Sequence, residues 1–256
     1  MKNSLLVLIL ILIFKGNFFT PSIAQEQFNF DVTEIEINEK GNKYKGLKRG
    51  TISTNNGVYI NADTFEFDKI TNILNAYGNV IIKDKRNDLI ITSEDITYLR
   101  NKEKIFTKTR SKAVSKDIYI DADSLEYDKK LNMLNAKGNV QVNEKVKKLI
   151  INSDEITYYK DSETLVSKYR SEAIGEGLNI KADEFEYNYI LNLVNANRNV
   201  KIEDKVNDII LLSENVTYLK NKEKIFTQGN TETVIETKYN FLSKDTILLR
   251  NEMQLS

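Results

Sequence analysis

One long motif occurs three times in this chain. It reads NADTFEFDKITNILNAYGNVII at 61–82, DADSLEYDKKLNMLNAKGNVQV at 121–142 and KADEFEYNYILNLVNANRNVKI at 181–202. The segments 57–116, 117–176 and 177–236 align without a gap, so the period is 60 residues. Self-similarity at a fixed period is typical of proteins that stack one supersecondary unit on the next. We therefore expect three stacked copies of a single unit.

Each copy contains a shorter repeat. The octapeptide ITSEDITY at 91–98 restates INADTFEF at 60–67, about thirty residues later, and NFLSKDTILLRN at 240–251 resembles the same segment again. Apolar and polar residues alternate with a period of two, and Ile, Val, Thr, Tyr and Phe dominate, which predicts strands. Polar clusters at 68–72, 83–88 and 100–104 predict short turns between antiparallel neighbours. The expected fold class is all-β.

The phase of the alternation changes once in each half-unit. Ile60 and Ala62 share one parity, whereas Phe65 and Phe67 have the other. The same change follows five further small residues: Ser93, Ala122, Ser153, Ala182 and Ser213. A bulge or corner lets a strand keep its apolar face inward while the chain bends from one sheet to another. We expect two facing sheets that enclose an apolar interior, with a small residue at each bend.

The aspartates that follow these bends have two readings. Capping of backbone amides by Asp63, Asp123 and Asp183 is the favoured role, and calcium ligation is the alternative. The nonapeptide of calcium-binding β-helices is missing, and we expect neither a metal nor a cofactor. The Gly-Asn pairs at 78–79 and 138–139 indicate a bulge or a close backbone approach. Because Arg198 replaces the glycine in the third copy, we infer that a positive φ is not obligatory there.

The alternation also predicts which side chains point inward, although it does not separate core packing from ligand contact. In the first copy the inward candidates are Ile60, Phe65, Phe67, Val80, Ile82, Ile96 and Tyr98. In the second they are Ile120, Leu125, Tyr127, Val140, Val142, Ile156 and Tyr158. In the third they are Ile180, Phe185, Tyr187, Val200, Ile202, Val216 and Tyr218.

The first 24 residues differ from the rest. Lys2 precedes the apolar run 5–14, and the segment ends on Pro21-Ser22-Ile23-Ala24, which is typical of a signal peptide cleaved after Ala24. The run is short for a transmembrane helix, which needs about 20 apolar residues, although an uncleaved anchor is the alternative. The predicted organisation is therefore a signal peptide at 1–24, β half-units at 25–56, three repeats at 57–236 and the start of a further, truncated half-repeat at 237–256.

Composition excludes several classes of function. The chain has 37 basic and 37 acidic residues, interspersed along its length, so it lacks the basic stripe of a nucleic-acid-binding protein. Cysteine, histidine and tryptophan are absent. Without Cys and His, the chain lacks disulfides, the commonest general base and the best nucleophile. A polysaccharide-acting enzyme needs one asymmetric pair of carboxylates, whereas every motif here is threefold. We expect a protein that is not an enzyme.

The repeated A-D-x-x-x-Y/F-D, A-x-G-N-V and S-x-x-I-T-Y motifs resemble the OstA family, which includes the lipopolysaccharide-transport protein LptA and the periplasmic N-terminal domain of LptD. The resemblance covers 57–236 and, more loosely, the flanking half-units. It implies a twisted, V-shaped antiparallel β-jellyroll whose hydrophobic groove carries the lipid A acyl chains of lipopolysaccharide. It also implies end-to-end β-strand augmentation with other OstA-type domains, in a bridge across the periplasm of a Gram-negative cell to the outer membrane.

Two forms of such a protein stay open. A free-standing bridge protein resembling LptA is one, and an N-terminal piece of an LptD-like translocon, which continues into an outer-membrane barrel, is the other. The opening FDVTEIEI and the unfinished last half-unit favour the piece. The absence of cysteine departs from translocons that join this domain to the barrel through disulfides. The alternative function is a structural repeat protein of the cell envelope, adhesin-like or a solenoid spacer. Such a protein would fill its interior with side chains, whereas we expect a carrier to keep a gap between its sheets.

Overall fold

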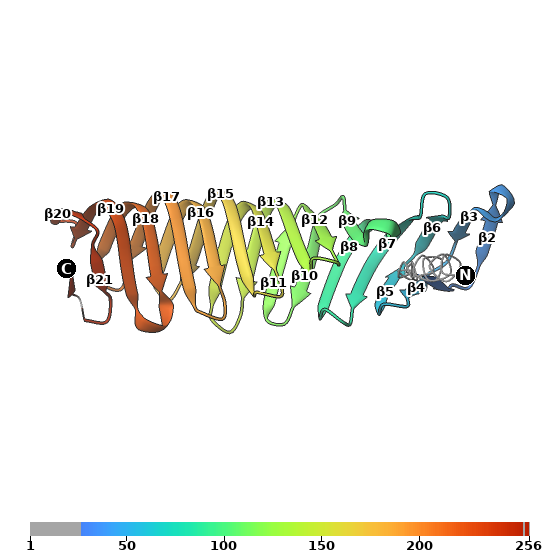
Figure 1. The fold of residues 1–256 in the computed structure, drawn as a ribbon, viewed down its shortest axis with the longest axis horizontal. Helices are drawn as coiled ribbons and strands as arrows, with labels where there is room; N and C mark the ends of the chain where they lie inside the picture. Colours follow the sequence, from blue (N-terminus) through green and yellow to red (C-terminus); the bar gives the residue numbers. More distant parts are fainter. Residues whose placement is uncertain (1–26, 253, 256) are drawn as a thin grey trace, which may run out of the picture.

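The computed structural model describes residues 27–252 and 254–255, so the predicted signal peptide lies outside the described residues. Most of the described residues lie in strands (Figure 1). The strands are β1 Phe28–Asp31, β2 Ile35–Asn38, β3 Lys43–Gly46, β4 Gly50–Thr54, β5 Val58–Ala62, β6 Thr64–Asp68, β7 Ile73–Asp84, β8 Leu89–Leu99, β9 Lys104–Thr107, β10 Ser111–Ser115, β11 Ile118–Ala122, β12 Ser124–Asp128, β13 Met133–Glu144, β14 Leu149–Tyr159, β15 Thr164–Gly175, β16 Leu178–Asn188, β17 Leu193–Asp204, β18 Ile209–Leu219, β19 Lys224–Ile235, β20 Tyr239–Lys244, β21 Ile247–Leu249 and β22 Gln254–Leu255. Three single-turn 3-10 helices are η1 Glu39–Gly41, η2 Arg100–Lys102 and η3 Lys220–Lys222. None of the helices among these residues has the length and apolarity needed to span a membrane.

All the strands pair antiparallel, and most pairings join strands that are close in sequence, although β1 pairs with β4 and β3 with β6. From β13 to β19 each long strand pairs with the one before it and the one after it. The strands run across the long axis of an elongated molecule, so each new strand adds to its length (Figure 1). The predicted all-β, antiparallel fold class is confirmed.

The strands bend near their middle in two alternating ways. In β8 the buried residues Ile91 and Ser93 are followed by Ile96 and Tyr98, so the parity changes as predicted. In β7 the parity is kept across the bend, because Gly78 and Asn79 adopt φ values of 76° and 46° and leave the ladder. Each half of a bent strand thus lies in one of two walls, with its apolar side toward the other wall.

Bends of the β7 kind require a positive φ, which corrects the inference from Arg198 that a positive φ is not obligatory there. Arg198 has φ 63° and the following Asn199 has φ 52°, so the third copy repeats the backbone conformation of the glycine-containing copies. Tyr169 and Arg170 in β15 do the same, at 65° and 46°. The bend demands this conformation from whichever residues occupy it, because the ladders on both sides fix the chain direction.

The aspartates at the bends also differ from the expectation. The carboxylates of Asp63, Asp123 and Asp183 accept hydrogen bonds from side-chain amides rather than from backbone amides. Their donors are the Nδ2 atoms of Asn79, Asn139 and Asn199, at 2.8, 2.7 and 2.8 Å. Hydrogen bonds from Asn79 and then Arg49 hold the pKa of Asp63 below its usual range. These aspartates join the two kinds of bend on adjacent strands.

The two walls meet along both long sides of the molecule. On one side they are continuous through the bends, where Ala62, Ala122 and Ala182 are buried as predicted. On the other side two rows of turns face each other. Turns at 69–72, 100–103, 129–132, 160–163, 189–192 and 220–223 end wall 1, and turns at 55–57, 85–88, 116–117, 145–148, 176–177 and 205–208 end wall 2. We call the line where these rows meet the mouth.

Candidate functional site

The interior between the walls holds every site residue predicted from the sequence. None of these residues, from Ile60 in the first copy to Tyr218 in the third, is more than 5% exposed. They belong to one continuous apolar cluster rather than to a single pocket. The structure therefore brings them together as an apolar lining along the length of the molecule.

The prediction omitted part of this interior. Leu74, Leu134 and Val194 lie early in β7, β13 and β17 and are buried, as is Leu165 in β15. They lie in wall 1, each beside a predicted residue of the adjacent strand. Leu74 in β7, for example, pairs with Tyr98 in β8. The same period-two alternation marks these residues in the sequence, and it could have identified them.

The interior is closed, which corrects the expectation of a gap between the sheets. Large apolar side chains from both walls fill it, as expected of the structural alternative. A cavity of about 30 Å³ lies among Leu149, Leu178, Tyr187 and Val194. A water molecule occupies a similar volume in the liquid, so this cavity is far too small for an acyl chain. A guest of that size requires the walls to separate.

One aromatic residue per half-unit lies near the mouth end of wall 1, and together these residues form an aromatic ladder. The ladder comprises Phe67, Tyr98, Tyr127, Tyr158, Tyr187 and Tyr218. Burial raises the pKa of Tyr158 to about 12 and also raises the pKa values of Tyr127, Tyr187 and Tyr218. These phenols therefore stay neutral at physiological pH.

A second row, which we call the rim, follows the ladder at a fixed spacing of two residues. Its members are Lys69, Arg100, Lys129, Lys160, Tyr189 and Lys220, with Arg250 placed likewise after Leu248. Each rim residue donates its backbone N–H to a carbonyl oxygen in or next to the preceding turn, at 2.9 to 3.1 Å. The acceptors are Asn42, Asn72, Glu103, Asn132, Glu163, Asn192 and Glu223. Sequence reasoning missed the rim, although a basic residue two positions after five of the six ladder aromatics was visible.

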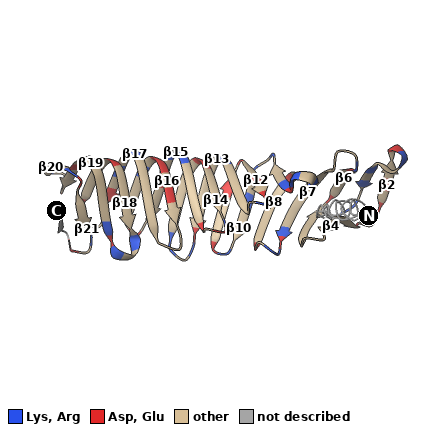
Figure 2. Cartoon of the chain, in the orientation of Figure 1, with Lys and Arg blue, Asp and Glu red and all other residues tan. Residues whose placement is uncertain are grey.

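Several rim side chains lie over an aromatic ring of the layer before them, whereas Lys160 lies over Tyr158 of its own layer. The guanidinium carbon of Arg100 lies 5.4 Å from the ring centroid of Phe67, and the amine of Lys129 lies 5.4 Å from that of Tyr98. Tyr189, the one uncharged rim residue, meets Tyr158 edge-on at 6.3 Å. A cation over an aromatic face is attracted by the ring's quadrupole. Figure 2 shows charged residues of both signs distributed along the molecule.

Polar contacts between the two rows of turns close the mouth. The hydroxyl of Tyr127 donates to Asp84 Oδ2 across the mouth at 2.9 Å. The amine of Lys160 donates to Ser115 Oγ, and that of Lys116 pairs with Glu163. Several of these partners lie more than forty residues apart in the chain. The closed interior is therefore held at the mouth by side chains, and at the bends by backbone.

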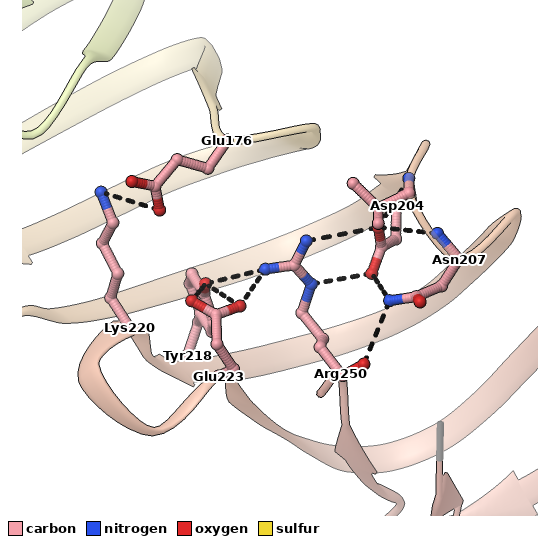
Figure 3. A network of polar contacts seen from close by, with 8 residues as sticks. Glu176, Asp204, Asn207, Tyr218, Lys220, Glu223 and Arg250 are labelled. Carbon is pink, nitrogen blue, oxygen red and sulfur yellow. Dashed lines mark hydrogen bonds and ion pairs between the residues drawn. The ribbon is translucent and has the colours of Figure 1, made fainter. Parts of the chain in front are cut away.

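The mouth contact nearest the C-terminus is a buried ion pair (Figure 3). Arg250 Nε donates to Asp204 Oδ2 at 2.7 Å, and the two side chains are 6% and 1% exposed. The same guanidinium contacts Glu223 and donates to the hydroxyl of Tyr218. Burial opposes ionisation of Asp204, but hydrogen bonds from Arg250 and Asn207 outweigh it and hold the pKa of Asp204 below its usual range.

The arrangement suits an amphiphile better than a reaction. An apolar interior lies beneath a row of phenols and cations, as at the boundary between a lipid's hydrocarbon and its headgroup. Within the described part of the chain, no group of three or more Asp and Glu side chains is placed to hold a metal ion.

Comparison with known proteins points to one family. Residues 59–164 match the family described as "LptA/(LptD N-terminal domain) LPS transport protein". No curated protein matches the chain. Among solved structures, LptH of Pseudomonas aeruginosa, the LptA-homologous periplasmic component of its lipopolysaccharide transport device, is 13% identical, with a TM-score of 0.26, and the match covers 55% of this chain and 82% of that one. The resemblance seen in the repeats is therefore confirmed over 59–164, the residues that match the model of the LptA and LptD N-terminal domains.

Proposed function

We propose that this protein transports lipopolysaccharide by holding the lipid A acyl chains between its two walls. The observation that carries the proposal is the unbroken apolar interior, lined in every layer by residues such as Phe65, Leu125 and Phe185. An acyl chain of about a dozen methylenes costs on the order of 10 kcal/mol to expose to water, at about 0.8 kcal/mol per CH₂. An apolar path across an aqueous compartment removes that cost.

The repetition of layers supports movement along the interior. Equivalent residues such as Ile96, Ile156 and Val216 offer a lipid successive sites of similar size and polarity. A lipid that moves by one layer exchanges one set of contacts for a similar set, so its free energy changes little. A chain built from one repeated unit suits a guest that must move past many positions.

Entry of a lipid requires the mouth to open. The contacts that close it are side-chain hydrogen bonds and ion pairs, such as Lys116 with Glu163, rather than ladder hydrogen bonds. Exposed ion pairs contribute about 0 to 1 kcal/mol each, so a bound acyl chain can outweigh several of them. The walls then separate about the bends while every strand keeps its neighbours.

We infer further that the ends of the stack pair with other OstA-type domains. The strand β20 pairs only with β19 among the described strands and is exposed along its whole length, and Phe241 and Leu242 are 45% and 83% exposed. An unprotected strand edge of this kind is a template for strand addition. The proposed setting is a bridge in the periplasm that reaches the outer membrane, with β half-units at 25–56 and 237–256 flanking three repeats at 57–236, after a signal peptide at 1–24.

Photo-crosslinking tests the carrier against the structural spacer. A crosslinking amino acid replaces Phe65, Tyr127 or Tyr187 in the interior, and Tyr77, which is 42% exposed, serves as the control. Expressed in a cell that makes lipopolysaccharide, a carrier gives lipid adducts at the three interior positions and none at position 77. Absence of adducts in the interior of a folded variant would favour the spacer.

A further inference from the structure

One layer of the mouth lacks the contact that closes its neighbour. In the second copy, the hydroxyl of Tyr127 is held by Asp84 and by Asn87 Nδ2, at 2.9 and 2.8 Å. Its counterpart in the next copy, Tyr187, is 1% exposed, and its hydroxyl has no hydrogen-bond partner among the described residues. The hydroxyl of the neighbouring Tyr189 is also buried without a partner there. Leaving a buried hydroxyl unsatisfied costs free energy, which a ligand with free acceptors would recover.

Two lysines converge on the same layer from opposite walls. Lys147 Nζ donates to the carbonyl oxygen of Tyr189 at 2.7 Å and lies 5.5 Å from its ring centroid. Lys220 Nζ donates to the carbonyl oxygen of Lys147 at 3.0 Å. Burial lowers the pKa of Lys147; Glu144 and Glu163 oppose that shift, and the nearby charge of Lys220 adds to it. Both ammonium groups are thus held by carbonyl oxygens in the layer that contains the two hydroxyls without a partner.

Glu176 is the one carboxylate that competes for these amines in an ion pair, within the described chain. Its Oε2 lies 3.6 Å from Lys220 Nζ, and its side chain is 51% exposed (Figure 3). Glu176 and Lys220 also border the cavity of about 30 Å³ beneath Tyr187. No carboxylate in that part of the chain forms an ion pair with Lys147. The layer therefore combines two cations, two unsatisfied hydroxyl donors and a small opening toward the interior.

We propose that Lys147 and Lys220, with the hydroxyls of Tyr187 and Tyr189, bind a phosphate group of the transported lipid. The inference rests on the proposed function, because the acyl chains of the same lipid would occupy the interior directly below. Two ammonium groups match the charge of a phosphate monoester, and its oxygens accept hydrogen bonds from all four side chains. On binding, Lys220 exchanges the half-exposed Glu176 for the phosphate.

Binding of two matched amphiphiles by the full chain tests this subsite. The probes are a bis-phosphorylated, acylated glucosamine disaccharide and the same molecule without phosphates. We expect the double variant Lys147→Gln/Lys220→Gln to bind the phosphorylated probe at least 10-fold more weakly, since hydrogen bonds to charged groups are lost. Its affinity for the phosphate-free probe should stay within 2-fold. Lys83→Gln/Lys108→Gln, which removes two exposed lysines elsewhere, is the matched control and should leave both affinities unchanged.

Two further variants keep the test decisive if the lysine variant folds poorly. Tyr187→Phe/Tyr189→Phe removes only the unsatisfied hydroxyls and should weaken binding of the phosphorylated probe by several-fold. Glu176→Gln removes the competing carboxylate and should tighten binding of the phosphorylated probe by a few-fold.

If both probes bind and none of these variants changes the affinity for one probe relative to the other, the subsite is wrong while the carrier stands. If neither probe binds the natural chain, the proposed function fails and the subsite with it. Displacement of the lipid by millimolar inorganic phosphate would identify free phosphate as the ligand instead and overturn the lipid assignment.

Discussion

Pairs of residues with positive φ explain why asparagine recurs at the bends. A non-glycine residue in the left-handed region costs about 1 to 2 kcal/mol, and asparagine tolerates it best. Gly78-Asn79 and Gly138-Asn139 meet the demand at low strain, and Asn199 keeps the second position when Arg198 takes the first. The side-chain amide of each asparagine then bonds the aspartate on the adjacent strand, so one residue type serves both the backbone and the contact.

Replacing Gly138 with alanine should lower the free energy of unfolding by about 1 to 2 kcal/mol. Gly138 has φ 76°, and an added Cβ would lie 2.5 Å from Asp123 Oδ2, so the aspartate must shift and strain its bond from Asn139. Urea unfolding followed by circular dichroism measures the change. The matched variant Arg198→Gly removes strain but frees the unfolded chain and loses exposed ion pairs, so it should stay within about 0.5 kcal/mol. Equal losses at both positions would contradict the role of positive φ.

At the scale of the strand, the sequence predicts which side chains point into the interior better than it predicts the contacts that close the mouth. The change of parity between Ile91 and Ile96 comes from contacts within one strand and its neighbours, so period-two alternation reveals it. The rim escapes such reasoning because Arg100 and Lys129 look like ordinary turn residues until the structure shows that each lies over an aromatic ring of the preceding layer. Contacts across the mouth join residues far apart in the chain, as Arg250 joins Asp204, and no local pattern records them.

The buried pair of Arg250 and Asp204 fixes β21 and its turn to wall 2. Replacing Arg250 with methionine should lower the free energy of unfolding by about 3 to 5 kcal/mol, because Asp204 then stays buried without its partner. The double variant Arg250→Met/Asp204→Asn should recover most of that loss, since the amide oxygen can still accept from the backbone N–H groups of Val206 and Asn207. A double-variant cycle in urea measures the coupling. A single variant as stable as the natural chain would show that the pair does not hold this end.

On the scale of the whole molecule, one apolar interior links every layer, and its boundary is marked by titratable groups of two kinds. Burial raises the pKa values of Tyr127, Tyr158, Tyr187, Tyr189 and Tyr218. Burial lowers the pKa values of Lys147 and Lys160 instead. In both cases the neutral form is favoured inside the mouth. We therefore expect the stability of the whole closed molecule to change with pH, because such groups occur in several layers.

The stability of the folded chain should fall steeply above about pH 10. Unfolded tyrosines ionise near pH 10, whereas Tyr158 keeps its proton to about pH 12 when folded, so between these values the folded state binds more protons. Their contribution is complete below pH 10 and is lost as the pH rises, at up to about 1.4 kcal/mol per pH unit for each phenol. Lys147 and Lys160 act in the opposite direction only up to about pH 10.4, where the ammonium of the unfolded chain loses its proton.

Urea midpoints from pH 7 to 11 should therefore be highest near pH 9 to 10. Tyr158→Phe should flatten the fall above pH 10, whereas Tyr59→Phe, at an exposed position, should not. A midpoint that stayed constant to pH 11 would mean that the phenols meet water, and that the mouth is open in solution.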